Sequence, residues 1–224
     1  MKLAALTSGG KDSLFAAYIM HSQGFKIKYL LTVLPERSDS YMFHHPSVRL
    51  TSYQARAMGI PRLTKGTEGE KEKELEDLKA LISSVKGEIE GVVSGALFSK
   101  YQKQRVDAIC EALNLRSFAP LWHKDPEMLL REMLDAGFEI IITAVAAMGL
   151  DENWLGRRID ERCIEDLKDL HKKYKIHICG EGGEFESLVL DMPLFKQRLE
   201  IVKARKECGI SGTYAIEQVK LVNK

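Results

Sequence analysis

The sequence predicts an α/β protein in which a Rossmann-like parallel sheet of about five strands carries helices on both faces and precedes a smaller α+β domain. Two observations lead to this fold class. In the first half, short apolar runs alternate about five times with segments of helical periodicity, as in parallel sheets covered by helices. In the second half, strand-like and helix-like segments follow no regular alternation. A chain of 224 residues can hold two such units, and we expect domains 1–122 and 123–224.

The elements of the first half follow from apolar patterns and the residues that end them. Helices are expected where apolar residues recur three or four apart. Gly24 should close the first helix in the left-handed conformation, and Gly59 should end the second. Pro35 should stop the second strand. The expected strands are 3–6, 27–34, 61–63 and 117–121, together with a strand that begins at residue 91 and runs into a glycine turn at 94–96. The expected helices are 14–23, 47–58, 75–85 and 106–113.

The second half has clear start and stop signals. Asp125-Pro126-Glu127 combines a capping side chain with a proline at the first helical position, so a helix should begin there and end at Gly137. A long apolar run over 138–147 should be a strand. The remaining expected elements are a helix over 163–174, an apolar run at 176–179, and strands at 188–190, 199–206 and 214–221.

The predicted topology brings three loops to one edge of the sheet. Right-handed crossovers place every strand-to-helix turn at the carboxyl ends of the strands, where ligands bind in such sheets. The loop after Leu6, the loop after Val33 and the turn at 94–96 should therefore meet. Thr32 and Val33, near the end of the second strand, should lie at this edge as well.

Composition excludes several classes of protein. The chain has 33 Lys and Arg against 32 Asp and Glu, a net charge of +1, so long-range capture of nucleic acid is not expected. No apolar stretch approaches a membrane span and no signal peptide is apparent, which predicts a cytoplasmic protein with no membrane association. No C-x-x-C pair is present, so zinc and iron–sulfur sites are unsupported. We expect all four cysteines to be small buried residues: Cys110, Cys163, Cys179 and Cys208.

A glycine-rich loop, Ser8-Gly9-Gly10-Lys11-Asp12-Ser13, lies between the first strand and the first helix. Its glycines allow close approach of the backbone to a phosphate, and the helix amino end favours an anion. Lys11 adds a charge, Ser8 and Ser13 add hydroxyl donors, and Asp12 is the candidate magnesium ligand. The spacing fits neither the G-x-x-x-x-G-K loop nor the G-x-G-x-x-G loop of nicotinamide sites. The loop therefore predicts binding of a phosphate group, with magnesium held by Asp12.

The hexapeptide resembles the PP-loop of the N-type ATP pyrophosphatases. That resemblance implies that residues 8–13 hold the pyrophosphate end of ATP and that Thr32 and Val33 lie beside the adenine. It also implies attack on the α-phosphate, formation of an adenylate and release of pyrophosphate and then AMP. Positive charge fixed around a pyrophosphate leaving group lowers the barrier to that step.

Two further segments narrow the resemblance. They are Ser94-Gly95-Ala96-Leu97-Phe98-Ser99-Lys100-Tyr101-Gln102-Lys103-Gln104-Arg105-Val106 and Gly180-Glu181-Gly182-Gly183-Glu184-Phe185-Glu186-Ser187, with Pro120-Leu121-Trp122 between them. Together with the PP-loop they are similar to the diphthine–ammonia ligases. That family amidates diphthine, a modified histidine of translation elongation factor 2, with ATP and ammonium, and forms AMP and pyrophosphate. The resemblance also implies an archaeal or eukaryotic host, and the length is that of the short archaeal form.

Roles follow for individual residues. Ser94, Gly95 and Ala96 should face the ribose or α-phosphate. Tyr101 and Arg105 share a helix face, and Arg105 is expected to bind the α-phosphate or the substrate carboxylate. His44 and His45 lie in a loop that is expected to fold over the ligand and bind substrate.

The acidic loop has three alternative roles. Glu181, Glu184 and Glu186, with Gly182, Gly183 and Phe185, are expected to bind the quaternary ammonium of diphthine or ammonium itself. One glutamate is instead a candidate to deprotonate ammonium or to bind magnesium. The expected catalytic residues are Lys11, Arg105, Glu184 and Glu186.

Other functions stay open at this point. A PP-loop enzyme that acts on transfer RNA is one alternative, although the catalytic cysteines or metal motifs of many such enzymes are missing. A nucleotide-binding regulator without turnover is another. No glutaminase domain fits in the chain, so free ammonium is the expected nitrogen donor. A homodimer is compatible with the sequence.

Overall fold

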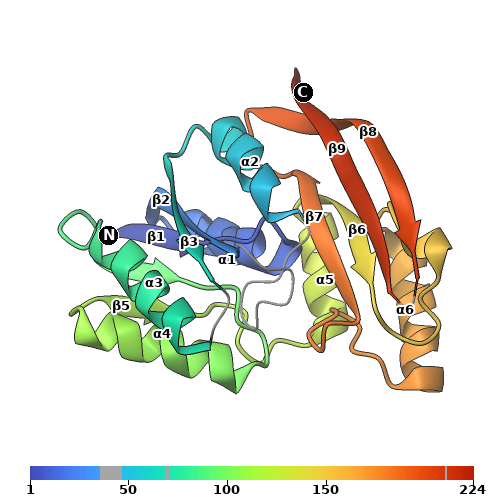
Figure 1. Ribbon diagram of the computed structural model, residues 1–224, viewed down its shortest axis with the longest axis horizontal. Coiled ribbons are helices and arrows are strands. Elements are labelled where there is room, and N and C mark those ends of the chain that lie inside the picture. The colour runs from blue at the N-terminus through green and yellow to red at the C-terminus, as the bar shows by residue number, and fades with distance from the viewer. Residues whose placement is uncertain (36–46, 69–70, 210) are drawn as a thin grey trace. The chain divides into compact units, whose positions relative to one another are not determined.

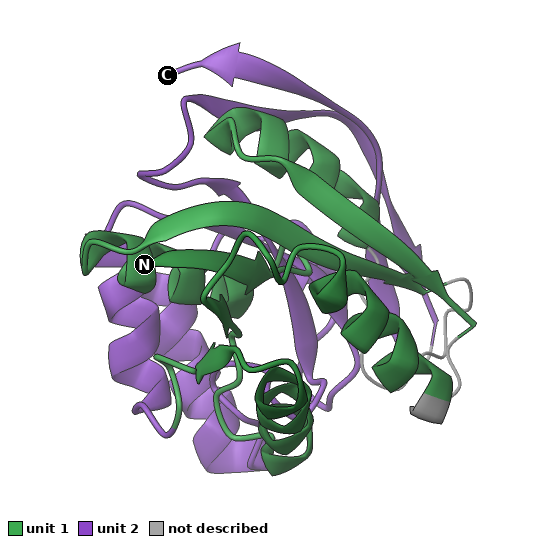
Figure 2. Cartoon of the chain, turned by 90° about the vertical axis from the view of Figure 1, so that its left-hand side faces the viewer, with its two compact units in different colours: residues 1–122 green, residues 123–224 purple. Residues whose placement is uncertain are grey.

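The computed structural model describes residues 1–35, 47–68, 71–209 and 211–224, in two compact units (Figures 1 and 2). The first unit covers Met1–Trp122 and the second covers His123–Lys224. Each unit builds a sheet of its own, and the two are described separately.

Five strands form the parallel sheet of the first unit, in the order β3-β2-β1-β4-β5. The chain moves outward from β1 in one direction and then returns to build the other side, so the order reverses between β1 and β4. The crevice beyond the carboxyl ends of these two strands is where ligands bind in sheets of this kind. The predicted parallel sheet is confirmed, and its strands are β1 (Lys2–Leu6), β2 (Lys26–Pro35), β3 (Arg62–Thr67), β4 (Gly91–Val93) and β5 (Arg116–Phe118).

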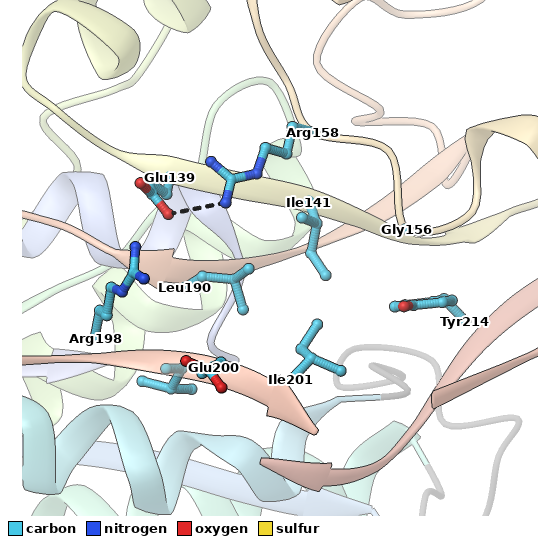
Figure 3. A pocket seen from close by; sticks show the side chains of 10 residues that line it. Glu139, Ile141, Gly156, Arg158, Leu190, Arg198, Glu200, Ile201 and Tyr214 are labelled. Atoms are coloured by element: carbon cyan, nitrogen blue, oxygen red, sulfur yellow. Dashed lines mark ion pairs between the residues drawn. The ribbon is translucent and has the colours of Figure 1, made fainter. Parts of the chain in front are cut away.

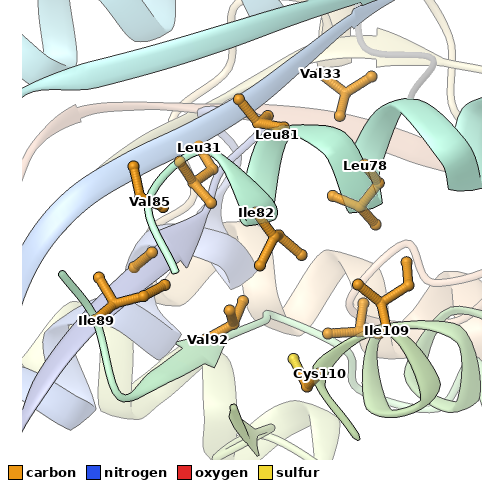
Figure 4. Close-up of a cluster of buried hydrophobic side chains, with 12 residues drawn as sticks. Leu31, Val33, Leu78, Leu81, Ile82, Val85, Ile89, Val92, Ile109 and Cys110 are labelled. Carbon is orange, nitrogen blue, oxygen red and sulfur yellow. The ribbon is translucent and has the colours of Figure 1, made fainter. Parts of the chain in front are cut away.

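Four α-helices connect these strands and cover both faces of the sheet. With right-handed crossovers, α1 and α2 lie on one face and α3 and α4 on the other. The second of these faces forms an apolar core in which Leu31, Val33 and Val92 of the sheet pack against Leu78 and Ile109 of the helices (Figure 4). The helices are α1 (Lys11–Ser22), α2 (Thr51–Met58), α3 (Lys71–Ser83) and α4 (Lys100–Ala112), and a 3-10 turn, η1 (Val48–Leu50), precedes α2.

Glycine and proline positions in the sequence predicted most of these helix and strand ends correctly. Gly24 has a φ of +88° just beyond α1, and Gly59 has a φ of +67° at the end of α2. β4 stops at Val93, so residues 94–96 lie beyond the strand, where a turn was expected. Two strands differ from the prediction. β3 extends to Thr67 because it pairs with β2 as far as Pro35, and β5 ends at Phe118 and not at residue 121.

The second unit contains an antiparallel sheet of order β7-β6-β9-β8 with two α-helices. Asp125 caps the first helix as predicted, because its carboxylate accepts a hydrogen bond from the Met128 amide at 2.9 Å. The apolar run at 176–179 forms no strand. The elements are α5 (Pro126–Asp135), β6 (Glu139–Val145), η2 (Glu152–Trp154), α6 (Glu161–Tyr174), β7 (Phe185–Asp191), β8 (Gln197–Cys208) and β9 (Gly212–Asn223).

The cysteines only partly follow the prediction. Cys110, Cys163 and Cys179 are buried, but Cys208 is exposed at the end of β8. Burial raises the pKa of the Cys110 and Cys163 thiols to about 11. Within the part of the chain that the structure describes, no helix is long and apolar enough to cross a bilayer.

Candidate active site

The loop between β1 and α1 leaves the amino end of the helix without a side-chain cap. Gly10 occupies the capping position in an extended conformation, with φ −78° and ψ 166°, and no side-chain hydrogen bond caps the helix. The amides of a first helical turn are donors that need an acceptor from outside the helix. This helix end is therefore suited to an anion, which is the role proposed for residues 8–13.

Hydrogen bonds inside the loop hold its shape. The Gly9 amide donates to Thr7 Oγ1 at 3.1 Å, and Ser13 Oγ donates to the Gly10 carbonyl at 3.1 Å. A φ of +86° at Gly9 lies in the left-handed region that side-chain-bearing residues avoid. The Gly10 amide reaches Ser8 Oγ at 3.4 Å, a long contact.

Lys11 and Asp12 form an ion pair at the start of α1. The Lys11 side chain is only 3% exposed, and its Nζ lies 2.8 Å from Asp12 Oδ2. The other carboxylate oxygen, Asp12 Oδ1, is buried and has no hydrogen-bond partner in the structure. Buried polar atoms are almost always paired, so this oxygen fits a cation such as magnesium. In the described residues, no group of three or more His, Cys, Asp or Glu is placed to hold a metal ion.

Two further buried hydroxyl groups lie at the carboxyl ends of the neighbouring strands. Ser94 follows β4, and its Oγ has no partner, as is also true of Thr32 Oγ1. Leu31 pairs with Leu6 at the end of β1, so Thr32 and Val33 lie just past the point where residues 8–13, the predicted phosphate loop, begin. The edge of the sheet thus carries unpaired oxygens on β2, α1 and the turn after β4.

The turn after β4 contacts the phosphate loop directly. A Cβ atom added to Gly95 would lie 2.6 Å from the Ser13 backbone nitrogen, and the next residue, Ala96, is 6% exposed. The structure thus places residues 94–96 beside the start of α1, and it gives Gly95 a packing role that the sequence analysis did not foresee.

Tyr101 and Arg105 stack on one face of α4, as their spacing predicts. The guanidinium carbon of Arg105 lies 3.3 Å from the centre of the Tyr101 ring. Arg105 Nε is buried without a hydrogen-bond partner. A stacked guanidinium with a donor to spare suits a phosphate or a carboxylate.

The acidic loop of the second unit is held by one of its own glutamates. Glu184 accepts hydrogen bonds from the His177 amide at 2.7 Å and from the Gly182 amide at 2.8 Å, one on each carboxylate oxygen. Glu186 is half-buried on β7, opposite Ala144 of β6. Phe185 is 3% exposed, so its ring belongs to the core and presents little surface to a ligand.

The other members of the predicted set are less informative. Glu181 is half-buried, and Gly182 and Gly183 are exposed. His44 and His45 lie outside the described residues. A hollow of about 240 Å³ in the second unit contains none of the predicted residues (Figure 3). Its rim carries an ion pair between Arg158 and Glu139, whose nearest atoms are 3.4 Å apart.

One residue at the site was missed by the sequence analysis. Gln54, on α2, is fully buried, and its Nε2 donates to the Gly9 carbonyl at 3.0 Å. Nothing in the sequence distinguishes this glutamine, because its acceptor is 45 residues away.

Two family models match separate parts of this chain. The model of the diphthamide synthase N-terminal domain matches residues 1–117, and that of the diphthamide synthase C-terminal domain matches residues 125–222. The chain is 40% identical to the diphthine–ammonia ligase of Rattus norvegicus, over 90% of this chain and 83% of the relative. It is 38% identical to the diphthine–ammonia ligase of Homo sapiens, over 89% of this chain and 82% of the relative.

Among solved structures, the chain is similar to one described as a predicted subunit of tRNA methyltransferase from Methanocaldococcus jannaschii. The TM-score is 0.44 and the identity 16%, over 77% of this chain and 88% of that chain. The family models and the curated relatives, by contrast, cover most of the chain at substantial identity. The chain therefore belongs to the diphthine–ammonia ligase family.

Proposed function

We propose that this protein amidates diphthine on translation elongation factor 2 with ammonium and ATP, in the last step of diphthamide synthesis. The observation that carries the proposal is the uncapped amino end of α1 with the buried Lys11 beside it, in a chain of this family. Such a site binds the phosphates of ATP, and the family supplies the acceptor and the nitrogen donor.

The reaction has two substitutions. A carboxylate oxygen of diphthine attacks the α-phosphorus, the bond to the bridging oxygen of the β-phosphate breaks, and pyrophosphate leaves from an acyl-adenylate. Ammonia nitrogen then attacks the acyl carbon, the bond to the AMP oxygen breaks, and a proton is released with the amide. Lys11 and the Gly10 amide stabilise the negative charge that develops on pyrophosphate.

The remaining residues of the first unit bind and orient ATP. Ser8, Ser13, Ser94 and the turn at 95–96 surround the phosphates and ribose, and Thr32 and Val33 flank the adenine. Asp12 is the residue that would hold magnesium through its unpaired Oδ1. A bound magnesium ion would neutralise phosphate charge.

Arg105, supported by the ring of Tyr101, binds the α-phosphate or the diphthine carboxylate. The acidic loop of the second unit handles the cationic partners, diphthine and ammonium. Glu184 and Glu186 are the candidates to take a proton from ammonium, and Glu184 also holds the loop, because both of its oxygens accept from backbone amides. His44 and His45 remain proposed substrate contacts. We propose a cytoplasmic enzyme that needs no nucleic acid; an archaeal host and a homodimer stay predictions.

Product analysis tests this proposal. The protein is incubated with diphthine-modified elongation factor 2, ATP and ammonium, and nucleotides and modified peptide are measured. AMP, pyrophosphate and a peptide amide should appear in equal amounts. ADP and phosphate would refute the chemistry. AMP release with transfer RNA but not with the modified factor would favour a different acceptor, and ATP binding without AMP under any condition would favour a regulator.

A further inference from the structure

The first turn of α2 contacts the phosphate loop at Gly9. Gln54 Nε2 donates to the Gly9 carbonyl at 3.0 Å, and a Cβ added to Gly9 would lie 2.8 Å from Gln54 Oε1 and 3.1 Å from Thr51 Cγ2. Both α2 residues are 0% exposed. The contact joins the fully buried side-chain amide of Gln54 to the glycine pair of the loop, where the backbone has the most conformational freedom.

α2 is itself held in position at this turn. Thr51 Oγ1 donates to the Val48 carbonyl at 2.6 Å and accepts from Arg62 at 2.5 Å. Arg62 begins β3, so the turn is tied to the sheet as well as to its own chain. Gln54, three residues after Thr51, therefore has a fixed base from which to hold Gly9.

Fixing the Gly9 carbonyl also fixes the Gly10 amide. The peptide bond between them is trans, so its C=O and N–H point in opposite directions. With the carbonyl turned to Gln54, the Gly10 N–H points the other way, toward Ser8 Oγ at 3.4 Å. A peptide between two glycines can rotate at little steric cost. Rotation by a half-turn would present a carbonyl oxygen to a bound phosphate in place of an N–H.

We propose that Gln54 is a positioning residue for the phosphate loop. It keeps the Gly9 carbonyl away from the pyrophosphate end of ATP and so keeps the Gly10 amide available as a donor. This inference rests on the proposed function, because it assumes that the loop binds pyrophosphate. Its effect is expected on anion affinity, through a residue that does not itself touch the anion.

The test is calorimetric binding of inorganic pyrophosphate and of ATP to the full chain and to Gln54→Leu and Gln54→Glu. Gln54→Leu removes the donor, so its affinity should fall roughly tenfold at every pH. Gln54→Glu cannot donate while ionised and should bind at least as weakly at about pH 8. A buried carboxyl group has a raised pKa. At about pH 6 the protonated side chain donates again, and its affinity relative to wild type at that pH should recover.

Matched controls use the exposed Gln104 of α4, changed to Leu and to Glu, which should bind as wild type does. Thermal unfolding of each variant shows whether the fold survives. Affinities of both Gln54 variants within twofold of wild type would overturn the inference while leaving the proposed function intact. The inference would also be overturned if, at about pH 6, the affinity of Gln54→Leu recovered relative to wild type as that of Gln54→Glu does. Failure of wild type to bind either anion would instead count against the proposed function.

If neither Gln54 variant folds, nuclear magnetic resonance of the wild type decides. Pyrophosphate should shift the Gly10 amide strongly, while the Gln54 side-chain amide stays protected from solvent exchange. A Gly10 amide that does not respond to bound pyrophosphate would overturn the inference.

Discussion

Gly95 lies against the backbone of Ser13: a Cβ atom at Gly95 would be 2.6 Å from the Ser13 nitrogen and 2.7 Å from the Asp12 carbonyl carbon. These are backbone atoms, which cannot move aside as a flexible side chain can. The turn after β4 and the first turn of α1 therefore meet at a position that only glycine fits. The contact joins the two strands on either side of the point where the sheet order reverses.

Gly95→Ala should consequently both destabilise the first unit and weaken ATP binding. The methyl group must displace the start of α1, and overpacking of this kind costs about 1–3 kcal/mol in the free energy of unfolding. Denaturant unfolding measures the first effect and calorimetry with ATP the second. Gly87→Ala is the matched control, because a Cβ there has no atom within 4 Å. Equal unfolding free energies and equal ATP affinities of the two variants would show that the Gly95 contact does not constrain the loop.

Lys11→Met tests the charge at the phosphate loop. Methionine keeps much of the buried aliphatic chain and removes the ammonium group, so the fold should survive. Loss of this charge from a nearly dry site should lower kcat/KM for AMP formation by about 100- to 1000-fold. Lys26→Met, at the exposed first residue of β2, is the control and should keep full activity. A folded Lys11→Met protein with activity within a few-fold of wild type would contradict the assignment.

The cysteines differ in reactivity because their surroundings differ. At about pH 8 an alkylating reagent should modify the exposed Cys208 quickly, since thiolate is the reactive form. Cys110 and Cys163 should react slowly, because burial raises their pKa from 9.0 to about 11 and keeps them protonated. Mass spectrometry of digested protein measures each site, and unfolded protein is the control. Rapid labelling of Cys163 in folded protein would contradict the burial.

The same two thiols predict a stability change at high pH. A thiol whose pKa is higher in the folded than in the unfolded protein stabilises the folded state. This contribution is fully present at pH values below the unfolded-state pKa, which is near 9. That contribution is lost as the pH rises through about 11. Unfolding midpoints measured across this window should therefore fall, and the double variant Cys110→Ala, Cys163→Ala should show a shallower fall than wild type.

Local patterns predicted most of the fold. The cap at Asp125 and the left-handed conformation of Gly24 depend on residues close together in sequence, so both could be predicted. The order of the four-stranded sheet could not be predicted, because β9 pairs with β6 across two intervening strands, β7 and β8. Cys208 was expected to be buried because cysteines usually are, whereas it lies at the exposed end of a hairpin.

The candidate site could be proposed from sequence where its residues are contiguous. Residues 8–13 suggest a phosphate loop through their composition and their position after a strand, and their role stays a prediction. Gln54 could not be found this way, since its partner is distant in sequence and a helix contains many ordinary glutamines. The sequence predicts a catalytic or binding role for Glu184, as for its neighbours, but gives no sign that its carboxylate holds the loop. The amides that donate to it belong to residues 177 and 182, which come together only in the folded loop.

Glu184 and Glu186 can be separated by their neutral variants. Glu184→Gln replaces one acceptor oxygen with an NH₂ group that must face a backbone N–H, from either His177 or Gly182. The expected cost is about 1–3 kcal/mol in the free energy of unfolding. Hydrogen exchange over residues 177–183 should accelerate, while the KM for ammonium changes little.

Glu186→Gln should give the opposite pattern. Its side chain is only half-buried on β7, and the change leaves the loop amides paired with Glu184, so stability and exchange should stay close to wild type. If Glu186 takes the proton from ammonium, kcat should fall roughly 100-fold, and the loss should not be reversed by saturating ammonium. Ammonium-dependent AMP formation measures this over a range of pH. The opposite result would be a stable Glu184→Gln protein that loses more kcat than Glu186→Gln does. It would assign the proton-accepting role to Glu184, because a carboxylate that only holds the loop should not affect kcat while the loop stays ordered.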